Sequence, residues 1–239
     1  MKALSTALAV LTWAVIASVN AQTADDIVTK YFNAIGGKEK IAGINTLYQE
    51  QTVEVMNNQA ASTTIIVNGK GFKNEIDFGG QKIINCVTDK GGWSINPMLG
   101  QSTPTPMTDE QFNAAKDQLD LGGPLLNYAK KGNKVELAGR ENLNGVETYK
   151  VKVTTTGNVE STYYFDPKTF YMLKNVSKLN VNGQDFETSI VFSDYRKTDY
   201  GNMLPYTVEM NLPQGFTIKT NVTKVEVNKP IDEKVFKAE

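Results

Sequence analysis

The spacing of hydrophobic residues near the start of the chain follows a helical repeat. Between residues 24 and 42, Ile27, Tyr31 and Ile35 fall on one face at intervals of about four residues. Two aspartates precede this face and suit the positive end of a helix. The pair Gly36–Gly37 suits the other end, because glycine commonly terminates helices. We therefore predict a helix before the glycines and one further helical turn after them.

From Thr46 onward the apolar residues recur at every second position. One example is Phe72, Ile76 and Phe78, which alternate with charged residues. The same alternation fills residues 134–227, where turn dipeptides with Gly, Asn or Pro interrupt it. A period of two predicts half-buried strands, and strands without helices between them predict an antiparallel meander. These rules give about eleven strands in the whole chain.

A segment of different composition separates the two groups of strands. Pro97 to Met107 is rich in Pro, Ser and Thr, which predicts a loop. Thr108 and Gln111 have the spacing of a capping box, so a helix is expected to follow. A second short helix is predicted over Leu125–Lys131, directly after a proline. These helices are either crossover helices fixed on the sheet or a hinged cover, and the pattern favours neither.

The predicted fold is mainly β with a few α-helices. A large antiparallel sheet buries one face, and the short helices are expected to cover that face. The covered space is either a filled core or a cavity for a hydrophobic ligand. Residues 22–239 are predicted to form a single domain, because no linker or repeat divides them.

The first 21 residues have the organisation of a secretory signal peptide. Lys2 supplies a positive charge, residues 7–17 are apolar, and Val19 and Ala21 are small residues before a cleavage site. We predict export through Sec, cleavage after Ala21 and a periplasmic location. The alternative is an uncleaved N-terminal anchor. Since Gln22 and not cysteine would begin the mature chain, no lipid anchor is expected there.

Charge and residue usage exclude several classes of function. Lys and Arg total 25 against 26 Asp and Glu, so the net charge of −1 predicts no nucleic-acid binding. The only arginines are Arg140 and Arg196, which argues against phosphate recognition. Cys86 is the only cysteine, so no intramolecular disulfide forms, and we expect a buried thiol.

The absence of histidine argues against catalysis. The sequence contains no histidine, which removes the commonest general base and metal ligand and every Ser-His nucleophile pair. We therefore predict no catalytic residue, no metal, no cofactor and no enzymatic activity. Hydrolysis by paired carboxylates or a Ser-Lys pair is the remaining enzymatic alternative.

The last third of the chain resembles the LolA/LolB superfamily, in the form found in Bacteroidetes. The motifs that carry the resemblance keep the order and spacing of that family over about eighty residues. They are Tyr164–Thr169 (YFDPKT) with Met172–Leu173, Phe192–Arg196 (FSDYR), Asn202–Pro205 (NMLP), and Val225–Asp232 (VEVNKPID) with Val235–Phe236.

This resemblance implies an open antiparallel half-barrel of about eleven strands under a helical lid. It further implies a soluble, monomeric periplasmic carrier that binds acyl chains of lipoproteins or other lipids in a hydrophobic concavity. The carrier would shuttle them toward the outer membrane, with an inner-membrane donor and an outer-membrane acceptor protein as partners. One feature departs from the family: its lid-holding arginine on an early strand has no counterpart in Thr46–Met56, which leaves the cargo open.

The candidate site residues follow from the alternating strands and the mid-chain helices. Those expected to line the cavity are Val53, Val55, Phe72, Ile76, Phe78 and Trp93. Those expected on the lid are Phe112, Leu119, Leu125 and Leu126. The alternative for both sets is an ordinary core. In that case the protein would be a non-enzymatic structural or interaction module of the cell envelope.

Overall fold

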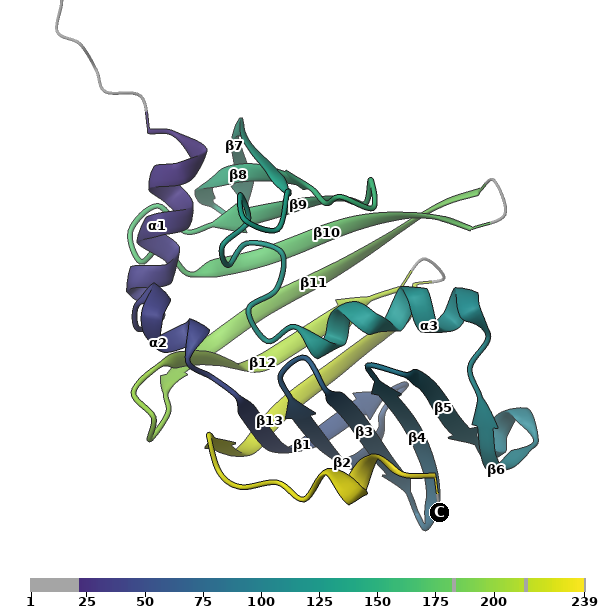
Figure 1. The fold of residues 1–239 in the computed structure, drawn as a ribbon. Coiled ribbons are helices and arrows are strands. Elements are labelled where there is room, and N and C mark those ends of the chain that lie inside the picture. Colours follow the sequence, from purple (N-terminus) through teal and green to yellow (C-terminus); the bar gives the residue numbers. More distant parts are fainter. Residues whose placement is uncertain (1–21, 182–183, 213–214, 239) are drawn as a thin grey trace, which may run out of the picture.

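Two β-meanders and a few short helices make up the structure (Figure 1). The computed structural model describes residues 22–181, 184–212 and 215–238, so the predicted signal peptide lies outside the described residues. The α-helices are α1 (Ala24–Ala34), α2 (Lys38–Ala42) and α3 (Asp109–Ala115), and the 3-10 helices are η1 (Pro97–Leu99), η2 (Lys116–Leu119) and η3 (Glu233–Phe236). The strands are β1 (Thr46–Val55), β2 (Asn58–Val67), β3 (Gly71–Phe78), β4 (Gln81–Thr88), β5 (Gly91–Asn96), β6 (Gln101–Pro106), β7 (Lys134–Leu143), β8 (Val146–Thr154), β9 (Glu160–Phe165), β10 (Met172–Val181), β11 (Gln184–Lys197), β12 (Met203–Asn211) and β13 (Thr217–Val227).

All thirteen strands belong to one antiparallel sheet. Their order is β6-β5-β4-β3-β2-β1-β13-β12-β11-β10-β9-β8-β7, so two meanders join where β1 pairs with β13. The sheet is not closed into a barrel, since β6 and β7 lie at its two edges. The predicted mainly β, open antiparallel fold is thereby confirmed, with thirteen strands in place of about eleven.

One of the additional strands lies where the sequence predicts a loop. Gln101–Pro106 forms β6, in which Thr105 lies opposite Ser94 and Pro106 lies opposite Trp93. Proline has no N–H to donate and is therefore confined to sheet edges and bulges. Because β6 is an edge strand, its prolines cost no hydrogen bond to a further neighbour. The loop prediction for Pro97–Met107 is wrong for the residues Gln101–Pro106.

The predicted helix over Leu125–Lys131 is replaced by consecutive turns. Asn127 has a φ of 53°, in the left-handed region, which a right-handed helix does not contain. The Tyr128 N–H donates to Leu125 O, and the Lys131 N–H donates to Asn127 O. Helical hydrogen bonding therefore does not continue beyond a single turn at any point in this stretch.

The N-terminal helix packs onto the second meander as the sequence predicts. Ile27 and Phe32 of α1 are buried in one cluster with Val151, Val153 and Phe165 of the sheet. The Tyr31 ring lies 5.2 Å from the Phe165 ring, centroid to centroid. Burial of this apolar stripe stabilises α1, because a helix of three turns has little stability alone.

A glycine lets α1 approach β12 closely. Gly36 has a φ of 122°, and a Cβ there would lie 3.0 Å from Asn202 Cα. Directly before it, Ile35 O accepts a hydrogen bond from the Met203 N–H at 2.9 Å. Asn202 is fully buried, and its backbone O accepts from the Thr198 N–H. A side chain at residue 36 would push the helix away from this contact.

The two faces of the sheet are covered by different parts of the chain. We call the face that packs against α1 and residues 120–133 the inner face; it carries Leu47 and Phe165. The outer face of β2, β4 and β5 is covered by η3, where Phe236 packs with Val67 and Cys86. No helix within the described ranges is long and apolar enough to cross a membrane.

The free energy of unfolding of the Thr23→Ala variant is expected to be about 1 kcal/mol lower than that of the wild type. Thr23 Oγ1 accepts from the Asp26 N–H at 3.1 Å, and Asp26 Oδ2 accepts from the Thr23 N–H at 3.0 Å, which together form a capping box. Urea denaturation measures the difference. Thr29→Ala is the control. Thr29 is exposed within α1, and alanine has the higher helix propensity, so this variant should lose no stability. Equal stability of Thr23→Ala and the wild type would contradict the prediction.

Candidate ligand-binding cleft

A cleft of about 860 Å³ lies between the second meander and the segment that joins the two meanders. This volume is within the range of small-molecule sites in proteins. The joining segment contributes residues of α3, η2 and the turns after them, and the sheet contributes β9, β10, β11 and the β8–β9 connection. The lining residues are Asn113, Lys116, Asp117, Asp120, Gly123, Pro124, Lys131, Asn133, Thr155, Thr156, Gly157, Val159, Ser161, Tyr163, Ser177 and Thr188.

Hydroxyl groups on neighbouring strands form the floor of the cleft. Ser161 Oγ and Ser177 Oγ are 2.9 Å apart, and Ser177 Oγ also lies 3.2 Å from Asn175 Oδ1. Burial raises the pKa of the Tyr163 hydroxyl to about 12, and the negative charge of Asp117 adds to the rise. Tyr163 is therefore protonated at neutral pH. The floor offers uncharged donors and acceptors to a polar ligand group.

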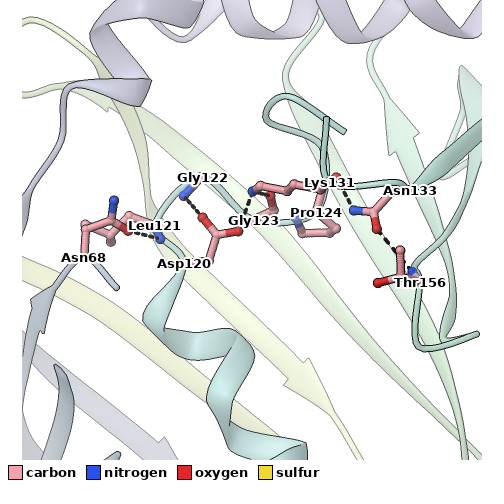
Figure 2. Close-up of polar contacts among 9 residues, drawn as sticks. All are labelled: Asn68, Asp120, Leu121, Gly122, Gly123, Pro124, Lys131, Asn133 and Thr156. Atoms are coloured by element: carbon pink, nitrogen blue, oxygen red, sulfur yellow. Dashed lines mark hydrogen bonds and ion pairs between the residues drawn. The ribbon is translucent and has the colours of Figure 1, made fainter. Parts of the chain in front are cut away.

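We call residues 120–133 the strap, and its first end is attached to the β2–β3 hairpin (Figure 2). Asn68 Oδ1 accepts from the Leu121 N–H at 3.0 Å. Next to it, the Gly69 N–H donates to Leu119 O at 2.8 Å. These two bonds hold the end of η2 and the start of the strap at the β2–β3 connection.

The strap is also closed on itself and attached to the second meander (Figure 2). Lys131 Nζ forms an ion pair with Asp120 and donates to Gly123 O at 2.6 Å. Asn133 Oδ1 accepts from the Thr156 N–H at 3.3 Å. The Lys131–Asp120 pair is partly exposed, and pairs of this kind contribute under about 1 kcal/mol. Several weak polar contacts at the two ends therefore hold the strap.

The four predicted lid residues lie in two different environments. Phe112 of α3 and Leu119 of η2 are half-buried, and neither helix contains a buried residue. Leu125 and Leu126 of the strap are buried in the core under α1. A helix without buried residues has few apolar contacts to hold it in place. The helical part of the cover is thus weakly packed, whereas the strap leucines are part of the core.

Five of the six predicted cavity residues share the inner face of the first meander. Strand register places Ile76 opposite Ser62, and Ser62 opposite Gln51, which is on the same face as Val53. Phe72 and Phe78 follow Ile76 at even spacing, and Val55 follows Val53. Val53 is buried and the other four are half-buried. None of the five lines the cleft described above.

The sixth residue, Trp93, lies on the outer face. It is opposite Cys86 in the β4–β5 pairing, and its Nε1–H donates to Phe236 O at 3.0 Å. The η3 segment therefore covers the indole ring, and the structure does not bring Trp93 together with Val53 or Phe78. Alternation along β5 was ambiguous by sequence, because only pairing with β4 decides which face a residue occupies.

A row of apolar side chains connects the cleft with the first meander. Ile190 is two residues after Thr188 of the cleft and lies opposite Met210. Met210 lies opposite Ile218, which in turn lies opposite Val55. Side chains directly opposite each other in a sheet point to the same face. A single row of apolar side chains therefore runs along the inner face from the cleft to Val55, and all four of them are half-buried. The same face also carries polar side chains such as Gln51 and Ser62.

Cys86 is expected to react with a disulfide reagent only when the protein unfolds. Burial raises the pKa of the Cys86 thiol to about 11, and its Sγ lies 3.4 Å from Phe236 O. The thiolate, which is the reactive form, is therefore scarce at pH 8. Absorbance after addition of Ellman's reagent should rise slowly in buffer and at once in guanidinium chloride. Rapid reaction of the folded protein would contradict this expectation.

The cleft residues were not among the sequence candidates. Ser161, Tyr163 and Phe165 alternate on β9 in the manner of a core face, and that alternation was the available signal. Hydrophobic periodicity selects apolar residues only, so it gives no signal for polar side chains on such a face. Among the described residues, no group of three or more His, Cys, Asp or Glu side chains could hold a metal ion.

Comparison with solved structures finds proteins whose fold is similar to this one. One is LolA superfamily protein NE2245 from Nitrosomonas europaea, with 13% sequence identity and a TM-score of 0.57 over 91% of this chain and 98% of that chain. Another is an outer membrane lipoprotein-sorting protein domain from Vibrio parahaemolyticus, with 13% identity and a TM-score of 0.57 over 89% of this chain and 97% of that chain. The protein has a LolA-like fold.

The LolA-like fold agrees with the resemblance of the sequence motifs. A DUF1329 family protein from Desulfovibrio piger is similar as well, with 12% identity and a TM-score of 0.60 over 91% of this chain and 98% of that chain. No model of a known protein family matches the sequence. No curated protein matches it either. The likeness is therefore one of fold, at low sequence identity.

Proposed function

We propose that the protein is a non-enzymatic carrier that binds a lipid or another amphiphile between its sheet and the strap. The observation that carries the proposal is the cleft of about 860 Å³ with a polar floor, from which a row of apolar side chains continues along the inner face. A molecule with a polar group and hydrocarbon chains matches both environments. The LolA-like fold, shared with a protein named for lipoprotein sorting, supports the same conclusion.

The polar group of the ligand would occupy the cleft. Ser161, Ser177 and Thr188 supply hydroxyls there, and Asn113 and Asn133 supply amides. Lysine and aspartate side chains are both present, so the lining has no excess of one charge. An arginine cluster, which would select phosphate or carboxylate bidentately, is absent from this lining. Lipoproteins and free lipids both carry a polar group next to their acyl chains, so this lining does not distinguish between them.

The hydrocarbon part of the ligand would extend along the inner face toward the first meander. The row from Ile190 to Val55 leads to Phe72, Ile76 and Phe78, which are half-buried and retain surface for a ligand. Burying apolar area on these side chains is favourable by about 25 cal/mol per Å². The five inner-face candidates thus keep their proposed role as lining, and Phe112 and Leu119 keep theirs as lid.

Export fits this role. We propose that residues 1–21 direct the chain through Sec and are removed after Ala21, so that residues 22–239 act in the periplasm as a monomer. An inner-membrane donor and an outer-membrane acceptor would then exchange the ligand with the carrier. Intact mass of the protein recovered from the periplasm gives the cleavage position directly.

Extraction of the purified secreted protein with organic solvent tests the proposed function. Mass spectrometry is expected to detect lipid in the extract. The lipid-free protein should unfold at lower temperature and regain its stability when the lipid is returned, because ligand binding to the folded state shifts the equilibrium. Absence of lipid together with no binding of a fluorescent fatty acid would refute a carrier.

The alternative is an interaction module of the cell envelope with a filled core. It predicts a protein partner in periplasmic crosslinking and no affinity for fatty acids. An open cleft of about 860 Å³ favours the carrier, because filled cores contain few voids larger than a water molecule.

A further inference from the structure

The connections between strands lie at two ends of the sheet, because successive strands are antiparallel. The pairing of Val55 with Ile218 aligns the two meanders, so that each end collects connections from both. In Figure 1, β10 and β11 run from the side of α1 on the left to the other end on the right. We call this second end the apolar rim. It comprises residues 56–57, 79–80, 97–100, 155–159, 212, 215 and 216.

The two ends differ in charge. The described residues of the apolar rim include no Lys, Arg, Asp or Glu. The opposite end comprises residues 68–70, 89–90, 144–145, 166–171 and 198–202. It contains Lys70, Asp89, Lys90, Asp166, Lys168 and Asp199. Connections on a protein surface that faces water are usually polar. The lack of charged residues in the rim therefore needs a physical explanation.

Exposed hydrophobic side chains concentrate on the same rim. Among the described residues, six large hydrophobic side chains are exposed, and five of them belong to the apolar rim. They are Met56 at 61%, Met98 at 62%, Leu99 at 74%, Val159 at 38% and Phe216 at 38% exposure. Met56 and Phe216 are on adjacent connections, since β1 pairs with β13 up to Val55. The sixth, Leu137, is on β7.

We propose that the apolar rim is the surface by which this protein touches a phospholipid bilayer. Its apolar side chains are carried on four separate connections, each with one or two of them. A protein partner of ordinary type would require a continuous, closely packed patch. A bilayer interface accepts separate side chains, each gaining free energy according to the apolar area that it buries.

The first charged residues behind the rim limit how deeply it enters the bilayer. Lys82 forms an ion pair of 2.6 Å with Glu75, and Glu160 forms one of 2.6 Å with Lys152. Asp77 accepts a hydrogen bond from the Gly80 N–H at 2.6 Å. These groups are one to four residues from the rim, so the contact is shallow and involves the connections alone. Charged groups are costly within the hydrocarbon.

The rim also borders the proposed ligand cleft. Thr155, Thr156, Gly157 and Val159 form the β8–β9 connection and line the cleft at the same time. A bilayer in contact with the rim would thus lie directly at the edge of the cleft. The inference rests on the proposed function in this respect only: an amphiphile could then pass between bilayer and cleft without crossing water, where its chains would be exposed.

Vesicle sedimentation tests the contact, with large vesicles of phosphatidylcholine and the chain of residues 22–239, which contains all described elements. The wild type is expected to sediment with the vesicles. The triple variant Met56→Ser, Leu99→Ser and Phe216→Ser should partition at least about tenfold less, because three apolar contacts are lost. Leu137→Ser is the matched control and should bind as the wild type does. Binding should persist in 0.5 M salt, since no charge is involved.

A fluorescent reporter shows which end touches the lipid. Cysteines are introduced one at a time as Met56→Cys, Phe216→Cys and Lys90→Cys, and each is labelled with an environment-sensitive dye while Cys86 stays buried. Vesicles should shift the emission to the blue for the first two and leave the third unchanged. A shift at Lys90→Cys alone, equal loss of binding in Leu137→Ser, or no sedimentation of the wild type would overturn the proposal.

Two further outcomes keep this proposal separate from the carrier function. If the apolar rim instead joins two copies of the chain, light scattering gives a dimer that the triple variant abolishes, and vesicle binding is absent. That outcome overturns membrane contact. If the wild type fails to bind vesicles but still binds a fluorescent fatty acid, the rim proposal fails and the carrier function stands.

Discussion

The double variant Thr188→Trp and Ser177→Trp is expected to bind a long-chain amphiphile at least about tenfold more weakly than the wild type. Both residues line the cleft from neighbouring strands, β11 and β10, and both are half-buried. Two indole rings would occupy the space that we assign to the polar group of the ligand. Displacement of a fluorescent fatty acid measures the affinity.

The control for this experiment is Ser193→Trp. Ser193 is on β11 as well, but it is exposed and is not part of the cleft. It therefore introduces the same aromatic side chain into the same strand without filling the site. Unchanged affinity in the double variant would mean that the ligand does not use the cleft. Equal loss in Ser193→Trp would point to a general disturbance of β11.

The Phe165→Ala variant is expected to lose about 3 to 5 kcal/mol of its free energy of unfolding. Phe165 is fully buried on β9, and its ring packs 5.2 Å from the Tyr31 ring of α1. In the sheet it lies opposite Tyr149 on one side and Met172 on the other. Truncation leaves a cavity where α1 meets the second meander, and the neighbours can fill it only in part.

Guanidinium denaturation followed by circular dichroism measures this loss. Phe216→Ala is the matched control, because Phe216 is exposed and its truncation should change the stability by less than about 0.5 kcal/mol. A loss below about 1.5 kcal/mol in Phe165→Ala would show that the core under α1 repacks around the smaller side chain.

The weak packing of α3 gives the proposed lid a physical basis. Neither α3 nor η2 has a buried residue, whereas Leu125 and Leu126 at the other end of the cover belong to the core. Opening would therefore involve α3 and η2, with the buried part of the strap as the fixed end. The hydrogen bonds of Asn68 to Leu121 and of Gly69 to Leu119 are the contacts that would break first.

Periodicity in the sequence predicted a helix or strand correctly where its own residues favour the conformation that the folded structure contains. The apolar stripe and the terminating glycines of α1 appear in the structure as predicted, whereas its N-cap is Thr23 and the two aspartates lie in the first turn. The β6 strand and the turns at Leu125–Lys131 were mispredicted because local rules conflict there with edge pairing and with the left-handed Asn127. Such conflicts are resolved by neighbours that are distant in the sequence.

The sequence by itself determined the fold class, because strands with a period of two need only local alternation to be recognised. It also excluded histidine-dependent chemistry and an intramolecular disulfide, since the lack of histidine and the single cysteine are properties of composition. Tertiary structure decided which face each strand presents, and so it separated Trp93 from Phe72, Ile76 and Phe78. It alone brought Ser161, Ser177 and Thr188 together under the strap. The physical reason is strand register. Alternation predicts that a strand has two faces, but only its pairing with distant strands determines which residues lie on the same face of the sheet.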